Sequence, residues 1–142
     1  TPSAQPGTLT AVDRTNAEAA AQLMSKIFGS DLSRSRDRVA LMLLEQGRKV
    51  FIYQRRGLTI GVLNAQLGPP NTYMIYGVGI AEQHRSHGHG TAMMHLALTE
   101  LFKEADTLTL EVESTNEHAI TLYTNLGFTP VMQMDYHRLT LV

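Results

Sequence analysis

Three consecutive strand-like runs between two helical patterns constrain the fold more than any other feature of this sequence. The runs are KVFIYQ at residues 49–54, LTIGVLNAQL at 58–67 and TYMIYGVGI at 72–80. Residues 55–57 (Arg-Arg-Gly) predict a hairpin between the first two runs, and GPPN at residues 68–71 predicts the next turn. Because β-branched and aromatic residues favour strands, these runs predict three consecutive strands.

Helical patterns stand on both sides of these strands. Apolar residues recur at helical spacing over residues 16–28 and over about 35–46, where Gly47 gives a normal stop signal. The strongest amphipathic helix follows Gly90, and its single apolar side predicts that it lies against a sheet. A short strand is expected at residues 8–12, ahead of all of them.

In the C-terminal third of the chain, predicted strands and helices continue to alternate. TLTLEV at residues 107–112 predicts a strand, and in the helix that follows, Ser114 and Glu117 have the spacing of a capping box. Residues 126–128 (Leu-Gly-Phe) have the pattern of a Schellman ending, and residues 131–142 predict one or two closing strands. The order β-α-α-β-β-β-α-β-α-β-β predicts a mixed α/β sheet with helices on both faces.

Composition bounds the class of protein. The chain has 142 residues, the size of one domain, with a formal charge of -1 and no cysteine. The lack of cysteine excludes disulfides, thiolate metal sites and an acyl-cysteine intermediate. A near-neutral chain without an apolar run of about 18 residues predicts no nucleic-acid and no membrane partner, and without a signal peptide we expect a cytoplasmic protein.

The first seven residues contain proline, serine and glycine and predict a flexible, linker-like N-terminus. A single domain is then expected over residues 8–142. Because the chain begins with threonine, it is compatible with one domain of a longer or tandem protein.

The segment HRSHGHG at residues 84–90 is the most unusual in the chain. Its three histidines could converge on a metal ion, but no carboxylate or cysteine with familiar ligand spacing accompanies them, so we expect no metal. A histidine-rich exposed turn is the plainer alternative. Gly88 and Gly90 stand at a helix N-terminus, where unpaired N–H groups and the helix dipole favour an anion. Arg85, and His87 when protonated, would add positive charge, so a phosphate-binding loop is the hypothesis we favour.

Two common nucleotide signatures fail here, since no lysine follows either glycine and Met93 replaces the third glycine of the dinucleotide pattern. RSHGHG does fit [Q/R]-x-x-G-x-[G/A], the acyl-CoA pyrophosphate loop of the GNAT superfamily of N-acetyltransferases. NEHAITLYTNLGF at residues 116–128 resembles the second signature of that family, N-x-x-A-x-x-x-Y-x-x-x-G-F. From Thr8 onward the chain resembles a GNAT domain, which implies a mostly antiparallel sheet.

The resemblance implies acetyl-CoA as co-substrate. Its pyrophosphate would lie on the N–H groups of the loop, and its pantetheine arm would bond the end of the preceding strand. Gly77 and Gly79 favour a bulge in that strand, or else ease the curvature of the sheet. The implied cofactor-binding residues are Val78, Gly79, Ile80, Arg85, Ser86, His87, Gly88, His89, Gly90, Thr91 and Asn116. The sequence departs from the usual family pattern at Glu82, Ser86 and His89, where proline, glycine and an aliphatic residue are common.

Tyr123 in the second signature is the predicted general acid. A phenol of pKa about 10 can protonate a departing thiolate whose conjugate acid has a pKa of about 8.5. Asn116 lies two helical turns earlier on the same side and resembles the family residue that hydrogen-bonds the cofactor arm. The lack of cysteine favours direct attack by a primary amine in a ternary complex. The general base stays open between water and the side chains of Glu111, Glu113, Tyr73, Tyr76 and His118.

Other functions also stay open: a GNAT-like domain that binds acyl-CoA without catalysis within a larger protein, or a metal-binding module. Acceptor choice would fall to FGSDLSRSR at residues 28–36 and to the closing strands near Asp135 to Arg138. Arg34, Arg36 and Arg38 could steer an acidic acceptor, although a solvated helix face is the interpretation we favour. Polyamine, amino acid, antibiotic, peptide N-terminus and protein lysine are all compatible with the sequence, as is a homodimer.

Overall fold

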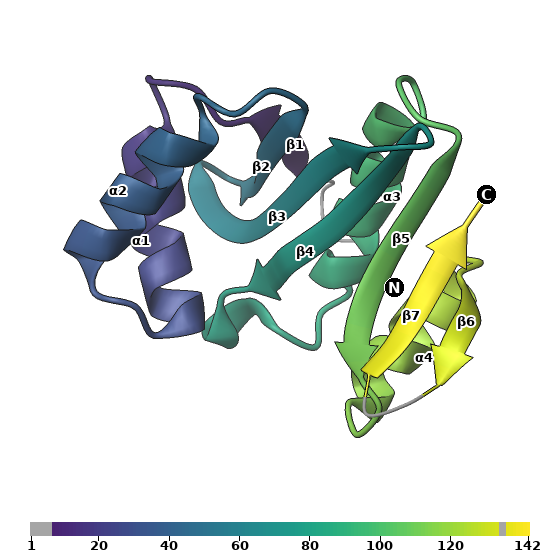
Figure 1. Cartoon of the computed structure of the whole chain (residues 1–142). Helices are drawn as coiled ribbons and strands as arrows, with labels where there is room; N and C mark the ends of the chain where they lie inside the picture. Colours follow the sequence, from purple (N-terminus) through teal and green to yellow (C-terminus); the bar gives the residue numbers. More distant parts are fainter. Residues whose placement is uncertain (1–6, 134–135) are drawn as a thin grey trace.

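The structure is a computed structural model that describes residues 7–133 and 136–142 (Figure 1). Its elements are β1 (Thr8–Ala11), α1 (Ala17–Phe28), α2 (Leu32–Met42), β2 (Arg48–Arg55), β3 (Leu58–Gly68), β4 (Thr72–Ile80), a 3₁₀ turn (Glu82–His84), α3 (His89–Leu101), β5 (Thr107–Glu113), α4 (Glu117–Asn125), β6 (Thr129–Gln133) and β7 (Tyr136–Leu141). This order confirms the predicted α/β fold class. None of the described helices has the length and apolar character needed to cross a membrane.

The strands form one seven-stranded sheet in the order β1-β2-β3-β4-β5-β7-β6. Among the described strands, β4 and β5 are the only parallel neighbours, and every other pair is antiparallel. The sheet is therefore mixed and mostly antiparallel, as expected. Its two antiparallel parts meet at the β4–β5 pair.

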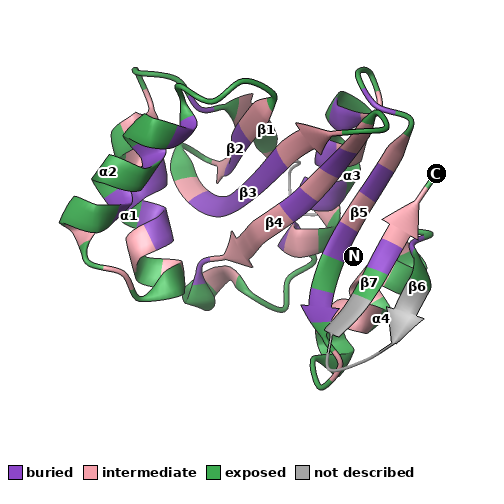
Figure 2. Ribbon diagram, in the orientation of Figure 1, coloured by how far each residue is buried: buried purple, intermediate pink, exposed green. Residues whose placement is uncertain are grey.

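Helices cover both faces of the sheet. On one face α1 and α2 pack on β2 and β3 around a cluster that includes Ala20, Met24, Val39, Ile52 and Val62. On the other face α3 and α4 pack around a larger cluster that includes Leu63, Ile75, Met93, Leu110 and Phe128. Figure 2 shows the resulting alternation of buried and less buried residues along β5 and the first half of β4, whereas residues 60–65 of β3 are all buried. Residue parity along β4 therefore decides which face a side chain reaches.

The second helix begins three residues and ends four residues before the predicted range of about 35–46. It begins at Leu32, because the Asp31 side chain accepts a hydrogen bond of 2.8 Å from the backbone N–H of Arg34 and so caps a new helix directly after Gly29 ends α1. It ends at Met42 and a turn follows, in which Leu44 N–H donates to the Leu41 carbonyl. The break between the first two helices is therefore short.

Candidate active site

The sheet is split where β4 meets β5. Their pairing covers four positions only and ends at Ile75 opposite Leu110. Beyond this point β4 stays paired with β3 as far as Ile80, and β5 stays paired with β7 as far as Glu113. Figure 1 shows the two strands parting toward their carboxyl ends. Residues 76–80 of β4 consequently turn an unpaired edge toward the gap.

A bulge in β4 lies at the start of this open edge. On β3 only Leu63 stands between Val62 and Asn64, whereas the facing stretch of β4 holds two residues, Gly77 and Val78. This extra residue confirms the bulge that the sequence predicts. A bulge bends its strand and increases the local twist, which directs the end of β4 away from β5.

Glycine is required at the bulge. Gly77 has a φ of 56°, and a Cβ there would lie 2.6 Å from Nδ2 of Asn64. That amide donates a 3.3 Å hydrogen bond to the Gly77 carbonyl, and Asn64 is almost fully buried. Asn64 was not singled out from the sequence, although a lone asparagine in an apolar strand run was a usable signal.

The glycine loop leads into α3 as expected. Gly88, with a φ of 80°, is the N-cap of the helix, and the first bond within it runs from Ala92 N–H to the Gly88 carbonyl at 3.1 Å. The N–H groups of residues 89–91 come before any intrahelical acceptor, so they point out of the helix end. Ser86 has a φ of 66°. The departure from the family's usual glycine thus falls at a position with a left-handed backbone.

Arg85 bonds the end of β4, and His87 bonds the loop backbone at Arg85. Nε of Arg85 donates to the carbonyl of Ile80 at 2.9 Å, and Nδ1 of His87 donates to the carbonyl of Arg85 at 2.7 Å. Both side chains are exposed. The Arg85 charge is therefore held at the point where β4 leaves the sheet.

His89 does not share this exposure. Only 6% of its surface is exposed, and its ring centroid lies 6.1 Å from that of Tyr53. Burial, with a further contribution from the nearby Arg55 charge, lowers the pKa of His89 below its usual 6.5. The imidazole thus takes the packing place of an aliphatic residue. Among the described residues, no group of three or more histidine or acidic side chains is arranged to hold a metal ion.

Asn116 is the N-cap of α4. Its side-chain oxygen accepts a 3.1 Å hydrogen bond from the Ala119 N–H. The predicted capping box of Ser114 and Glu117 is therefore wrong, because the cap lies two residues further along. The Asn116 oxygen stabilises the helix end, which leaves its amide N–H groups for a ligand.

Tyr123 is fixed by the end of the same helix. Phe128 N–H donates to the Tyr123 carbonyl and Gly127 N–H to the Thr124 carbonyl, at 3.1 and 3.0 Å, which confirms the predicted Schellman ending. The rings of Tyr123 and Phe128 meet edge to face with centroids 5.9 Å apart. Burial raises the pKa of Tyr123 above its usual 10. The phenol therefore keeps its proton across the neutral range.

Three segments singled out in the sequence converge at the split. A Cβ at Gly90, in the first turn of α3, would lie 3.5 Å from Leu122 in α4 and 3.9 Å from Ile80 at the end of β4. The glycine loop, the open strand edge and the helix that carries Tyr123 are thus neighbours in space, although 25 residues, 91–115, separate the first signature from the second.

The general-base candidates divide between different environments. Tyr73 is fully buried, and its hydroxyl donates to Glu104 at 2.8 Å; burial, then this bond, raises its pKa to about 12. Glu111 faces Arg138 across the strands at 3.8 Å. Glu113 and His118 are exposed.

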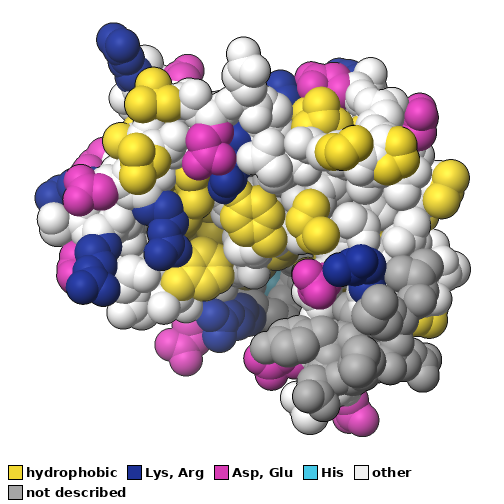
Figure 3. Space-filling view, viewed as in Figure 1, with side chains coloured by type: hydrophobic (Ala, Val, Ile, Leu, Met, Phe, Trp, Pro, Cys, Tyr) yellow, Lys and Arg dark blue, Asp and Glu magenta, His cyan; other side chains and the backbone are white. Residues whose placement is uncertain are grey.

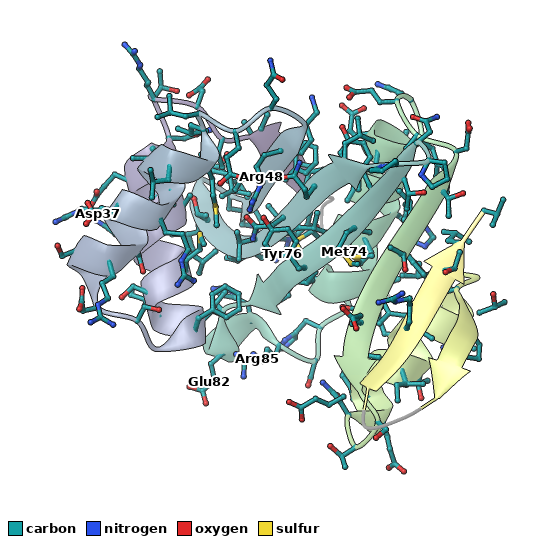
Figure 4. All side chains as sticks on the ribbon, in the orientation of Figure 1. Asp37, Arg48, Met74, Tyr76, Glu82 and Arg85 are labelled. Carbon is teal, nitrogen blue, oxygen red and sulfur yellow. The ribbon has the colours of Figure 1, made fainter. Side chains whose placement is uncertain are left out.

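Tyr76 differs from these groups. It is the first β4 residue beyond the last β4–β5 pair, and its buried hydroxyl has no hydrogen-bond partner among the described residues. The guanidinium of Arg48 lies over its ring, 5.0 Å from the centroid. Figure 4 shows Tyr76 and Arg48 together between α2 and β4, with Met74 toward β5. Asp135 in the acceptor prediction lies outside the described residues.

The split mixed sheet and the glycine loop at its opening define an α/β acyltransferase. The family model described as the acetyltransferase (GNAT) family matches residues 17–128. The chain therefore belongs to the GNAT acetyltransferase family, as its sequence predicts. No curated protein sequence matches the chain.

Solved structures share the fold at low sequence identity. The ribosomal-protein-S18-alanine N-acetyltransferase of Escherichia coli superposes with a TM-score of 0.79 at 20% identity, over 95% of this chain and 92% of that one. Mutant forms of the spermidine/spermine N-acetyltransferase SpeG of Vibrio cholerae give 0.80 at 18%, over 96% and 94%. An acetyltransferase of Thermus thermophilus gives 0.81 at 16%, over 97% of each chain.

Proposed function

We propose that this protein transfers the acetyl group of acetyl-CoA to a primary amine by direct attack in a ternary complex. The observation that supports this most is the convergence of the open β4 edge, the start of α3 and the helix that carries Tyr123. Acetyl-CoA supplies an acyl group activated as a thioester, with a thiol as leaving group. The proposal takes the protein to be cytoplasmic, without a nucleic-acid or membrane partner, as the sequence predicts.

The loop suits a pyrophosphate. A Cβ built at Gly88 meets no atom within 4 Å, so there is open space in front of the helix end. Backbone N–H groups and the helix dipole would hold the anion there, aided by the Arg85 charge. His89 would contribute its backbone N–H only, since its ring is buried and burial lowers its pKa. The loop residues in this role are Arg85, Ser86, His87, Gly88, His89, Gly90 and Thr91.

The open strand edge suits the pantetheine arm. Backbone groups of Val78, Gly79 and Ile80 face a gap where the neighbouring strand has left the sheet, so an amide-containing chain can add there as a strand would. The amide N–H groups of Asn116 would bond the same arm from α4.

Proton transfer falls to Tyr123 and to water, while Tyr76 positions the amine from the opposite face of the sheet. Tyr123 would protonate the departing thiolate, because burial keeps the phenol in its acid form. The Tyr76 hydroxyl would accept a hydrogen bond from the attacking amine, and water would carry the amine proton away. Neither step needs a covalent acyl-enzyme.

Calorimetric titration of acetyl-CoA and CoA tests the cofactor site. We expect micromolar binding to the unchanged chain and a loss of at least about 100-fold in Gly88→Glu, which sets a carboxylate against the pyrophosphate. Gly88→Asn is the matched control, since asparagine tolerates a positive φ and adds no charge. Equal binding by Gly88→Glu would contradict the assigned loop. No binding of acetyl-CoA by a well-folded chain would refute the proposed acetyl transfer. Binding of acetyl-CoA without any acetylated amine would favour a domain that binds acyl-CoA without catalysis.

A further inference from the structure

A groove runs along α2 on the face of the sheet opposite Tyr123. Its volume is about 520 Å³. It is lined by Arg34, Asp37, Arg38, Leu41, Met42, Glu45, Arg48 and Tyr76. The stretch of α2 from Arg34 to Met42 alone is about 12 Å long at ~1.5 Å per residue. That length matches about four residues of an extended chain at ~3.3 Å each.

The groove ends at the split in the sheet. Tyr76, which lines the groove, directly follows the last paired residue of β4, Ile75. Its hydroxyl is buried without a partner among the described residues, so a polar group is available there for a bound molecule. An amine at the end of a chain that lies in the groove would reach the gap in which the thioester is proposed to sit.

The arginines of α2 fall into two groups. Arg36 binds Glu18 of α1 through two hydrogen bonds of 2.8 Å and so fastens the two helices together. Arg34 and Arg38 line the groove instead. Arg34 is 3.7 Å from Asp31 with both side chains well exposed, a pair of little energy. Arg38 forms no ion pair with any described residue.

The carboxylates of the groove do not cancel this charge. Glu45 is bound to Arg48 at 2.6 Å, and Arg48 also lies over Tyr76. Asp37 lines the same groove as Arg34 and Arg38, so two carboxylates face three arginines there and a net positive charge of one remains. Figure 3 shows basic side chains over α1 and α2 bordering the apolar surface at the centre of this face. Guanidinium groups bind carboxylates through paired hydrogen bonds, so the groove favours acidic side chains.

We propose that the groove binds an acidic peptide segment that carries the acceptor amine. This inference rests on the proposed acetyl transfer and narrows its acceptor. A polyamine such as the spermidine named for the Vibrio cholerae enzyme would place ammonium groups against Arg34 and Arg38. A single amino acid would leave most of the groove length empty.

Steady-state acetylation by the full chain, followed by mass spectrometry of the products, tests the proposal. Four acceptors are compared: a glutamate-rich peptide with a free N-terminus, the same peptide with a blocked N-terminus and one lysine, an arginine-rich peptide of equal length with one free N-terminus, and spermidine. We expect one of the two acidic peptides to exceed the others in kcat/KM by about tenfold or more. Which acidic peptide reacts identifies the amine as N-terminal or lysine.

The double variant Arg34→Glu/Arg38→Glu should lower kcat/KM for the acidic peptide by about tenfold or more, through KM, with unchanged affinity for acetyl-CoA. Arg14→Glu is the control, because Arg14 is an exposed arginine that lines a separate groove with Val12 and Leu44. A preference for spermidine or the arginine-rich peptide, an unaffected double variant, or acetyl-CoA binding with no peptide product would overturn the proposal and leave the cofactor site standing. Failure to bind acetyl-CoA would overturn the proposed function itself.

Discussion

Tyr123 combines a fixed backbone with a partly buried phenol, so its hydroxyl can be tested without disturbing its packing. Tyr123→Phe keeps the ring against Phe128 and removes only the acid. We expect kcat to fall by about 10²- to 10⁴-fold with an unchanged dissociation constant for acetyl-CoA. Tyr73→Phe is the matched control, since it loses a bond to Glu104 far from the gap and should cost about 1 kcal/mol of stability with little change in kcat. An unchanged kcat in Tyr123→Phe would assign the proton to another donor.

His89 predicts how stability responds to acid. Because burial lowers its pKa in the folded state, the folded protein favours the neutral ring. The stability from this neutral ring is complete above the unfolded pKa of about 6.5 and is lost as the pH falls through the lowered folded pKa. His89→Leu should therefore show a smaller drop in Tm between neutral and mildly acidic pH than the unchanged chain. His95→Leu, on the exposed side of the same helix, should leave the pH dependence as it is; equal slopes in all three proteins would refute the assignment.

Among the elements, the β2–β3 hairpin carries a turn that its sequence does not suit fully. Arg56 and Gly57 connect the pair Arg55–Leu58, with φ values of 53° and 78°. Two positive φ values define a type I′ turn, in which asparagine is favoured at the first position. Arg56→Asn should raise the free energy of unfolding by about 0.5 to 1 kcal/mol, measured by urea denaturation. A loss of stability would mean that the arginine side chain contributes more than its backbone costs.

The order and type of the elements could be predicted from the sequence, because apolar periodicity and turn residues are local signals. Helix boundaries were less accessible, since Asp31 and Asn116 cap their helices where other polar residues offered equally good spacing. The convergence at Gly90 was out of reach of local pattern, because the contact with Leu122 depends on how two distant helices pack. Asn64 did offer a local signal as a lone asparagine in an apolar strand, but its partner Gly77 lies on the next strand and is seen only in the structure.

The grouping of the α2 arginines also needed the structure. Arg34, Arg36 and Arg38 look equivalent as an alternating run, and a solvated face was the favoured interpretation. A helix turns about 100° per residue, so Arg36 is directed to α1 while Arg34 and Arg38 line the groove.

For the whole molecule, the short β4–β5 pairing predicts where a bound cofactor changes hydrogen exchange. CoA should slow exchange of backbone amides in residues 76–80 and 86–91, with little change in the turn at residues 55–58. Binding at 100 times the dissociation constant should also add about 2.7 kcal/mol to the free energy of unfolding. Mass spectrometry of exchanged peptides checks the location, and thermal unfolding checks the gain. Protection confined to other segments would move the cofactor site.

The sheet, which opens beyond the four paired positions of β4 and β5, also separates two candidate binding regions. The α2 groove opens on one face of the sheet, and Tyr123 stands on the other, so exchanges along α2 need not disturb the donor side. In the function we propose, substitutions along α2 would therefore change the choice of amine and leave the cofactor site unchanged. The two proposed substrates, acetyl-CoA and the amine, would then be selected by separate parts of one fold.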